Sequence, residues 1–574
     1  MFDSEKTLND SPASSQSPGA DNQIWSSSDG NMMGQTGTNS PPLTATSEET
    51  KTYPKGWRLF FLIVALTLSN FLIALDQAIV ATAVPKITDE FNAINDIGWY
   101  GSAYLLTVSC CQLLFGKFYT IFSIKWTFII AILTFELGSL ICAVAPSSTA
   151  LIIGRAIAGL GGGGVFSGVY VITAHSVPVS RRPLFAGLDS ATFGFGSVAG
   201  PLLGGVFTDK VTWRWCFYVN LPLGALSVFL VILSVANYRG TEARDNRGGW
   251  GKTIAVLDLP GLTSLLVAVV CLLLALQWGG TRYPWDAGRV IAILVLFTVL
   301  SVAFLALQWF LARDYKSLPS RQVATQRSVA AGCLFFLGWG AAFMSTVYFL
   351  PVWFQAIQGV SAFESGVRTI PLILGYAVAS MLGGIAVTKL GYYTPFMLLA
   401  SALMAVGAGL LTTLTPDSGA GAWIGYQAMF GIGLGFGADL PLVAVQTVLP
   451  LGQVASATGL LMFAQTLGAT IFISVAQNVF ARRLIIHLRR AFPGLDPLVV
   501  LDTGATKLRS VFDVDRNPAI LTAYNKALNE TFLVPTVMSS ITMAGSLAME
   551  WASVRDEPDA RESSHAEGEA EHAL

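Results

Sequence analysis

The sequence predicts an all-α integral membrane protein with about fourteen transmembrane helices. Hydrophobic residues make up 53% of the 574 residues and charged residues only 12%. The mean hydropathy of +0.59 is that of a membrane protein rather than of a soluble domain. From Trp57 onward, apolar segments recur, each near the ~20 residues that an α helix needs to cross ~30 Å of hydrocarbon. The expected surroundings of the chain are therefore a lipid bilayer.

The apolar runs place the spans in order. Residues 1–56 are polar and rich in Ser, Gly, Asn and Pro, which predicts a disordered cytoplasmic tail. We then predict spans at 59–84, 97–116, 126–145, 150–173, 184–207, 216–236, 255–276, 289–312, 328–354, 366–387, 393–414, 422–443, 454–479 and 532–551. Residues 552–574 form an acidic tail.

The distribution of Lys and Arg predicts the orientation. An even number of spans places both termini on one side. The loops of that side, with the first flank, hold sixteen Lys and Arg, against six in the short opposite loops, so both termini should be cytoplasmic. The long loop at about 481–530 is an exception, because it carries four Arg on its external side, but long loops count less in this rule. The sequon at Asn529 would also be external, which makes it a candidate glycosylation site.

Two similar loops indicate an internal repeat. A tight turn with Gly and Lys joins the second and third spans at 116–126, and another joins the tenth and eleventh at 384–393. We therefore predict a six-helix bundle at 57–236 and a linker region with two inserted helices at 237–327. A second, parallel six-helix bundle at 328–551 would include the long external loop.

The fifth predicted span carries a stripe of small residues. Gly196, Gly200 and Gly204 recur at every fourth position, so on a helix they form one bare face for close packing. Pro201 lies within the stripe and favours a bend, and Gly205 follows it. Any membrane bundle uses Gly for close packing, but this combination also predicts a helix that takes part in a conformational switch.

The same residues carry a family resemblance. The Gly196–Gly205 string resembles the fifth-helix signature of antiporters in the major facilitator superfamily. The string WRWCFYVNLPLG at 213–224, an aromatic cluster typical of membrane interfaces, resembles the junction of spans 5 and 6 in its fourteen-span drug:proton antiporter branch. Many fungal multidrug and secondary-metabolite exporters belong to that branch. The resemblance implies alternating access, a small-molecule substrate, coupling to protons, and a cavity lined mainly by spans 1, 4, 9 and 12.

Ionisable side chains within the spans are the first candidates for function. Each costs ~2.5–3.5 kcal/mol at the bilayer centre, and Asp76, Glu136, Arg155, Asp189 and Asp439 lie there. The segments around Asp76 and Arg155 resemble the family's first-helix and fourth-helix signatures, and the family ties the Arg of the latter to proton coupling. We expect these two residues to form a proton-coupling pair. The alternative is a structural ion pair that fixes the helix register.

The other three acidic residues have no family motif. Glu136 is either a further proton-coupling site or a buried carboxyl that stays neutral. Asp189 lies close enough to Arg181 and Arg182 for an interfacial ion pair. Asp439 lies in a Gly-rich segment broken by Pro, and interrupted helices mark substrate sites in transporters. Further candidates for the cavity wall are aromatic and Gln side chains: Tyr348, Trp353, Gln355 and Gln427.

Other classes of function receive little support. No stretch of basic residues with interleaved aromatics suggests nucleic acid. The four His residues are scattered, and the six Cys residues show no metal-ligand spacing. We expect that the protein is not an enzyme and uses no cofactor or metal. We expect a monomeric exporter in the plasma membrane, or in a vacuolar or vesicle membrane. The alternatives are a proton-coupled importer, for instance of siderophores, and a receptor or channel.

Overall fold

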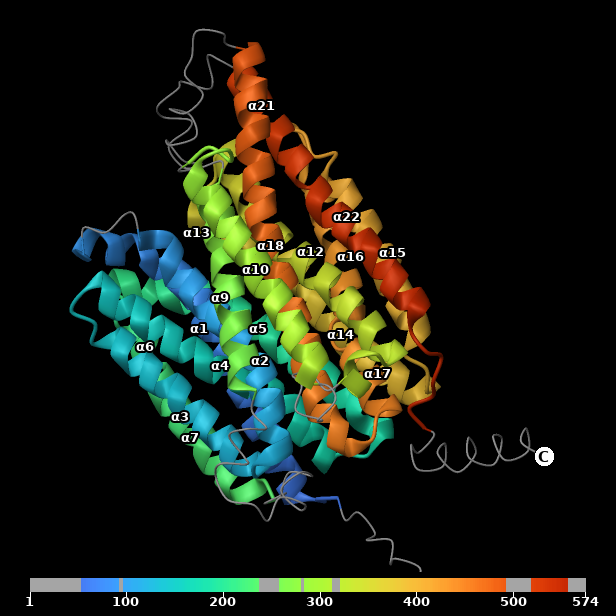
Figure 1. Ribbon diagram of the computed structural model, residues 1–574. Helices are drawn as coiled ribbons and strands as arrows, with labels where there is room; N and C mark the ends of the chain where they lie inside the picture. Colours follow the sequence, from blue (N-terminus) through green and yellow to red (C-terminus); the bar gives the residue numbers. More distant parts are fainter. Residues whose placement is uncertain are drawn as a thin grey trace, which may run out of the picture. The chain divides into compact units, whose positions relative to one another are not determined.

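The computed structural model describes residues 53–91, 96–236, 258–279, 283–311, 321–491 and 518–555 (Figure 1). Within these ranges every element longer than a bridge is helical, and thirteen helices are long and apolar enough to cross a membrane. A shorter apolar stretch, Thr263–Leu276, lies in the place of the predicted span at 255–276. The all-α membrane class is confirmed, and the number of fourteen spans stays a prediction.

The helices follow the predicted spans closely. In chain order they are α1 (Trp57–Phe91), α2 (Ile97–Ile121), α3 (Ile124–Ala143), α4 (Ser148–Ser176), α5 (Arg182–Lys210), α6 (Trp215–Tyr218), α7 (Asn220–Ser234), α9 (Leu259–Trp278), α10 (Gly288–Leu311), α11 (Arg321–Ala324), α12 (Arg327–Ile357), α13 (Ala362–Arg368), α14 (Ile370–Leu390), α15 (Thr394–Leu411), α16 (Ala420–Gly437), α17 (Leu440–Val448), α18 (Leu451–Ala491), α21 (Pro518–Thr531) and α22 (Leu533–Ala548).

Local chemistry fixes several helix ends. The Ser147 hydroxyl accepts a hydrogen bond from the Ala150 amide at the start of α4, and the Gln326 side chain accepts one from Val329 at the start of α12. Each cap satisfies one of the free amide groups that a helix leaves at its N-terminus. At its other end, α14 stops at Gly391, whose φ of 91° lies in the left-handed region that glycine adopts without strain.

The helices form two bundles with the same packing pattern. In the first, α1 packs on α5 and α7, α4 on α2 and α3, and α3 on α7. In the second, α12 packs on α18 and α22, α16 on α14 and α15, and α15 on α22. The bundles meet where α2 packs on α18 and α5 on α14, and α9 and α10 pack on each other. Both ends of the described chain lie at the lower edge of the view (Figure 1), and we call this edge the terminal side.

The glycine stripe of α5 packs on α1. A Cβ atom built at Gly196 would lie 2.8 Å from the Ala74 Cβ, and one at Gly200 would lie 2.5 Å from the Ala78 Cβ. The next glycine of the stripe meets α1 in the same way. By contrast, nothing lies within 4 Å of a Cβ built at Gly205, and Pro201 is exposed on the outer face. The close contact with α1 is therefore made by one face of α5 alone.

The aromatic cluster after α5 is partly buried. The Trp213 indole is only 4% exposed and donates a hydrogen bond of 2.6 Å to Glu90, near the end of α1, whereas Trp215 is 47% exposed. Arg214 forms an ion pair of 2.8 Å with the same carboxylate and lies over the Trp213 ring. The cluster therefore ties the connection before α6 to α1, in addition to any contact with lipid.

The structure shortens the predicted external loop at 481–530. The helix α18 continues to Ala491, and α21 begins at Pro518, while residues 492–517 lie outside the described part of the chain. Leu484 and Leu488, one turn apart on α18, are buried, so this polar-looking segment has an apolar face that hydropathy averaging hides. The Asn529 amide nitrogen, which a glycan would modify, donates a hydrogen bond to the Leu414 carbonyl. The predicted tails at 1–56 and 552–574 fall almost wholly outside the described residues.

Candidate functional site

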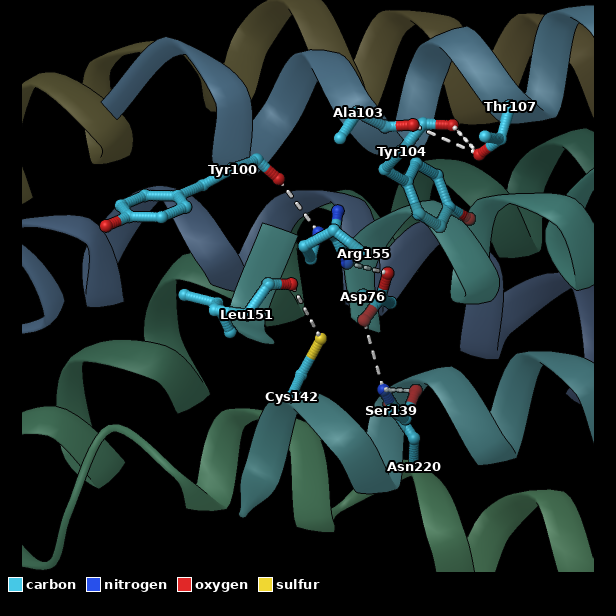
Figure 2. A network of polar contacts seen from close by, with 10 residues as sticks. All are labelled: Asp76, Tyr100, Ala103, Tyr104, Thr107, Ser139, Cys142, Leu151, Arg155 and Asn220. Atoms are coloured by element: carbon cyan, nitrogen blue, oxygen red, sulfur yellow. Dashed lines mark hydrogen bonds and ion pairs between the residues drawn. The ribbon is translucent and has the colours of Figure 1, made fainter. Parts of the chain in front are cut away.

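A buried ion pair joins α1 to α4. The Arg155 Nη1 lies 2.6 Å from the Asp76 Oδ2, and the two side chains are 2% and 0% exposed (Figure 2). The structure brings the two groups into direct contact. A charge-assisted hydrogen bond of this length between desolvated groups holds both side chains in place.

Neutral groups surround this pair. The Arg155 Nε donates to the Tyr100 carbonyl at 2.9 Å, and the guanidinium lies 4.3 Å from the centre of the Tyr104 ring. On the other side, the Asn220 amide donates to the Asp76 Oδ1 and to the Ser139 hydroxyl, each at 3.2 Å (Figure 2). The network therefore connects α1, α2, α3, α4 and α7, and neither charge depends on the other alone for its position.

Glu136 lies one turn away from Ser139 on α3. It is 8% exposed, and neither carboxylate oxygen has a hydrogen-bond partner among the described residues. A Cβ atom added at Gly224, one turn along α7 from Asn220, would collide with this carboxylate. The bare glycine thus makes room for a buried carboxyl beside the Asp76 network, which agrees with either role expected for Glu136.

A central cavity lies between the two bundles. It is lined by residues of α1, α2, α4 and α5 from the first bundle and of α12, α14 and α18 from the second. Asp439 reaches it from the break between α16 and α17. A concave, mostly apolar cavity with a few polar groups is the usual form of a small-molecule site.

Asp439 receives hydrogen bonds from the opposite bundle. Tyr170 of α4 donates to its Oδ1 at 2.9 Å, and Ser190 of α5 donates to its Oδ2. The carboxylate is 7% exposed and lies in the cavity wall. These contacts join the two bundles at the cavity itself.

Aromatic rings cover much of the cavity wall. On the side of the second bundle, Trp339 and Phe343 stack at 5.2 Å, and Phe343 stacks on Tyr376 at 6.1 Å. On the side of the first bundle, Phe166 meets Phe193 edge to face at 6.0 Å. The Trp339 indole donates to the Leu434 carbonyl at 3.0 Å, which fixes the orientation of its ring.

The other predicted cavity residues lie outside this lining. Tyr348 is 48% exposed on the outer face of α12, as a residue that faces lipid would be. Trp353 is buried instead against α21, where its indole donates to Asn525 at 2.8 Å. Gln355 donates to Ser365 at 3.0 Å, near the end of α12. These predictions were wrong because the polar and aromatic content of a span does not indicate which face of the helix meets the cavity.

Gln427 and Asp189 also differ from expectation. Gln427 is fully buried in α16, away from the cavity lining, and its amide has no hydrogen-bond partner among the described residues. Asp189 forms no ion pair with Arg182, whose guanidinium donates instead to the carbonyls of Ala174, Val177 and Gln446. The Asp189 carboxylate lines a separate small pocket, without a well-formed hydrogen bond. Among the described residues Asp189 forms no ion pair with Arg181 or Arg182, and the Arg182 guanidinium is already bound to backbone carbonyls.

Comparison with known proteins decides the family. The model of the Major Facilitator Superfamily matches residues 66–473, which is most of the chain. The chain belongs to the major facilitator superfamily. As a member of this superfamily of transporters it is an integral membrane protein and not an enzyme.

Curated relatives narrow the class to efflux. The MFS-type efflux pump MFS1 of Arthroderma benhamiae is 48% identical over 507 residues, which cover 88% of this chain and 94% of that protein. The aspyridones efflux protein of Neocamarosporium betae is 48% identical over 516 residues, which cover 90% of each. The efflux pump aflT of Aspergillus parasiticus is 44% identical over 508 residues, which cover 88% of this chain and 98% of that protein. The chain is an efflux transporter of this superfamily.

Solved structures support the fold alone. A proton:xylose symporter, XylE, superposes with a TM-score of 0.55 at 14% identity, over 83% of this chain and 94% of its own. The human organic anion transporter MFSD10 superposes with a TM-score of 0.54 at 14% identity, over 84% of this chain and 100% of its own. Both likenesses agree with the fold of two packed bundles described above.

Sequence reasoning missed several residues of the cavity in this superfamily member. Uncharged polar side chains line it: Asn70, Gln77, Gln112, Tyr170, Ser190, Gln465 and Thr466. The sequence contained a signal for these residues. Burying an amide side chain in an apolar span costs free energy unless the amide meets a polar group or a cavity. The amide of Gln112 illustrates this, since its oxygen accepts from Thr466 of the other bundle while its nitrogen has no partner among the described residues.

Proposed function

We propose that this efflux transporter exports amphipathic small molecules, such as drugs, toxins or fungal secondary metabolites, and couples their export to proton entry. The observation that supports coupling is the buried Asp76–Arg155 ion pair beside the cavity between the bundles. The relatives named after aspyridones and aflT support an organic small molecule as the substrate.

The chain can bind a proton without losing the positions of its side chains. When Asp76 accepts a proton, its ion pair with Arg155 weakens, but Arg155 keeps the Tyr100 carbonyl and the face of Tyr104. Asp76 keeps the Asn220 amide on its other oxygen. A proton therefore changes the charge between α1 and α4 while the local geometry persists. Glu136, a buried carboxyl one turn away, is the second proton-coupling group in this proposal.

Alternating access requires contacts that can separate. Near the terminal side, the backbones of α2 and α18 approach at Gly116 and Gly459, and those of α5 and α14 approach at Gly187 and Gly384. Bare backbones slide past each other more readily than interlocked side chains. In the proposed cycle these contacts open when the cavity faces the terminal side, which we assign to the cytoplasm from the excess of Lys and Arg. The working unit would be a monomer, most simply in the plasma membrane.

The test is transport in reconstituted vesicles. We expect uphill transport driven by an imposed pH gradient in the wild type and a loss of at least about tenfold in Asp76→Asn. Substrate binding and downhill exchange should remain in Asp76→Asn, because Asn keeps the size of the side chain. Glu364→Gln is the matched control, since it removes an exposed carboxylate of α13 that pairs with Arg368. Undiminished pH-driven transport by Asp76→Asn would refute this assignment.

Loaded cells separate export from import. Export predicts that compound loaded inside cells leaves faster when the protein is present. Faster uptake with no effect on loaded cells would favour the importer. The absence of any saturable flux would favour a receptor or channel instead.

A further inference from the structure

The central cavity contains a single type of charge. Of the side chains that line it within the described ranges, only Asp439 carries an ionisable acid or base apart from the tyrosines, and none is Lys, Arg or His. An anionic substrate would therefore meet a carboxylate with no basic side chain in the wall to balance it. A cationic substrate would meet its counter-charge.

Asp439 differs from Asp76 in its partners. Asp76 has Arg155 within 2.6 Å, so its charge is neutralised inside the protein. No basic side chain of the described residues forms an ion pair with Asp439, which receives only the hydroxyl groups of Tyr170 and Ser190. A buried carboxylate without a counter-ion is costly, and a bound cation would offset that cost.

The hydroxyl groups orient this carboxylate and leave it capacity. A carboxylate offers about four acceptor positions, and Tyr170 and Ser190 occupy one on each oxygen. Because the donors come from two helices of the opposite bundle, Asp439 is held in one orientation at the cavity wall. The remaining acceptor positions can receive the N–H groups of a protonated amine without displacing either hydroxyl group, and a quaternary ammonium group, which has no N–H, is attracted by the same negative charge.

The aromatic wall adds a second cation-binding feature. Trp339, Phe343 and Tyr376 line the same cavity as Asp439, and the first of these is fixed by its hydrogen bond to Leu434. The faces of aromatic rings attract an ammonium group by about 0.5–2 kcal/mol, and they also pack on an apolar ligand body. The charge of Asp439 and the aromatic surface therefore both favour a ligand with an ammonium group and an apolar body.

We propose that the cavity selects substrates in which a protonated or quaternary amine is attached to an apolar aromatic body, with the ammonium group beside Asp439. The aromatic body then lies against Trp339, Phe343 and Tyr376. This inference rests on the proposed export of amphipathic molecules and narrows it to amphipathic cations.

The test compares two probes that differ only in charge. One is a naphthylbutyl-trimethylammonium ion, and the other is its neutral isostere, in which a tert-butyl group replaces the trimethylammonium group. Binding to the purified full chain in a non-ionic detergent is measured by equilibrium dialysis. Comparing the wild type with Asp439→Asn for each probe cancels the partition of the probe into micelles.

We expect Asp439→Asn to weaken binding of the ammonium probe by about tenfold or more and to leave the isostere within about twofold. Glu364→Gln is the control, because it removes a carboxylate that lies outside the cavity and pairs with Arg368, and it should leave binding of the ammonium probe within about twofold. Two results would overturn the inference: an equal loss of ammonium-probe binding in the two variants, or an Asp439→Asn protein that still prefers the ammonium probe over the isostere as the wild type does. If neither probe binds while vesicles still export neutral compounds, this inference fails alone. If no compound of either kind is exported, the proposed function fails as well.

Discussion

Replacing Gly200 with Leu tests the contact on which the first bundle depends. A Cβ atom at this position would lie 2.5 Å from the Ala78 Cβ and 2.9 Å from the Ile79 amide nitrogen. Ordinary contacts between such atoms are about 3.5–4.0 Å long, so α5 must retreat from α1 by about 1 Å for the first carbon alone. The remaining carbons of Leu then extend into the same contact.

The expected cost is that of an overpacked helix contact. Insertions of this kind destabilise a packed core by about 1–3 kcal/mol, which a membrane bundle can tolerate without failing to fold. The effect on transport should be larger, because α1 carries Asp76 and α5 carries Ser190, one of the two hydroxyl donors to Asp439. We expect a protein that reaches the membrane but transports at least about tenfold more slowly.

The assay measures efflux from reconstituted vesicles beside surface delivery and thermal stability. Gly205→Leu is the matched control: it lies on the same helix, but nothing stands within 4 Å of the added Cβ. It should transport as the wild type does. Gly200→Ala should give an intermediate result. Normal efflux by a normally delivered Gly200→Leu protein would refute the role given to this stripe.

Three further variants probe other parts of the bundle. Arg155→Ala should lose pH-driven transport, because it leaves the buried Asp76 carboxylate without its partner. Arg155→Lys should restore only part of that transport, because an ammonium cannot reproduce the guanidinium fork; full rescue would contradict this. Pro201→Ala should transport nearly as the wild type does, because this exposed residue lies off the packed face, and a severe loss would show that the proline itself matters. Hydrogen bonds from Trp213 and Arg214 hold the pKa of Glu90 below its usual value of 4.5, so its stabilising contribution is present above that pH and is lost as the pH falls through the lowered pKa. Melting temperatures of the wild type and Glu90→Gln should therefore converge in acid, and a constant difference across pH would refute the assignment.

The sequence alone determined the class of the protein and most of its helices. Runs of apolar residues report burial in lipid or in the bundle wherever they occur, so the spans follow from composition and length. The stripe at Gly196, Gly200 and Gly204 could be assigned to a close contact for a similar reason, since a period of four residues defines one helix face. The local pattern did not name the partner, which the structure identifies as α1.

The charged residues show the limit of this reasoning. The cost of burying a charge marked Asp76, Arg155, Glu136 and Asp439 as exceptional without any knowledge of their neighbours. Hydropathy did not reveal that Asp76 and Arg155 touch while Asp439 has only hydroxyl partners. Asp76 and Arg155 are 79 positions apart in the chain, and Tyr170 and Asp439 are 269 positions apart.

Only the tertiary structure decided which helix faces line the cavity. Tyr348 and Trp353 look as suitable for a binding site as Trp339 and Tyr376 do, and all four lie in apolar spans. Tyr348 faces the outside of the bundle and Trp353 faces α21, whereas Trp339 and Tyr376 face the opposite bundle. In a membrane nearly every face of a helix is apolar, because lipid and protein interior are alike in polarity, so the alternation that separates surface from core in a soluble protein is missing. The direction of each face is set by how the two bundles pack, and that packing depends on contacts between residues far apart in the chain.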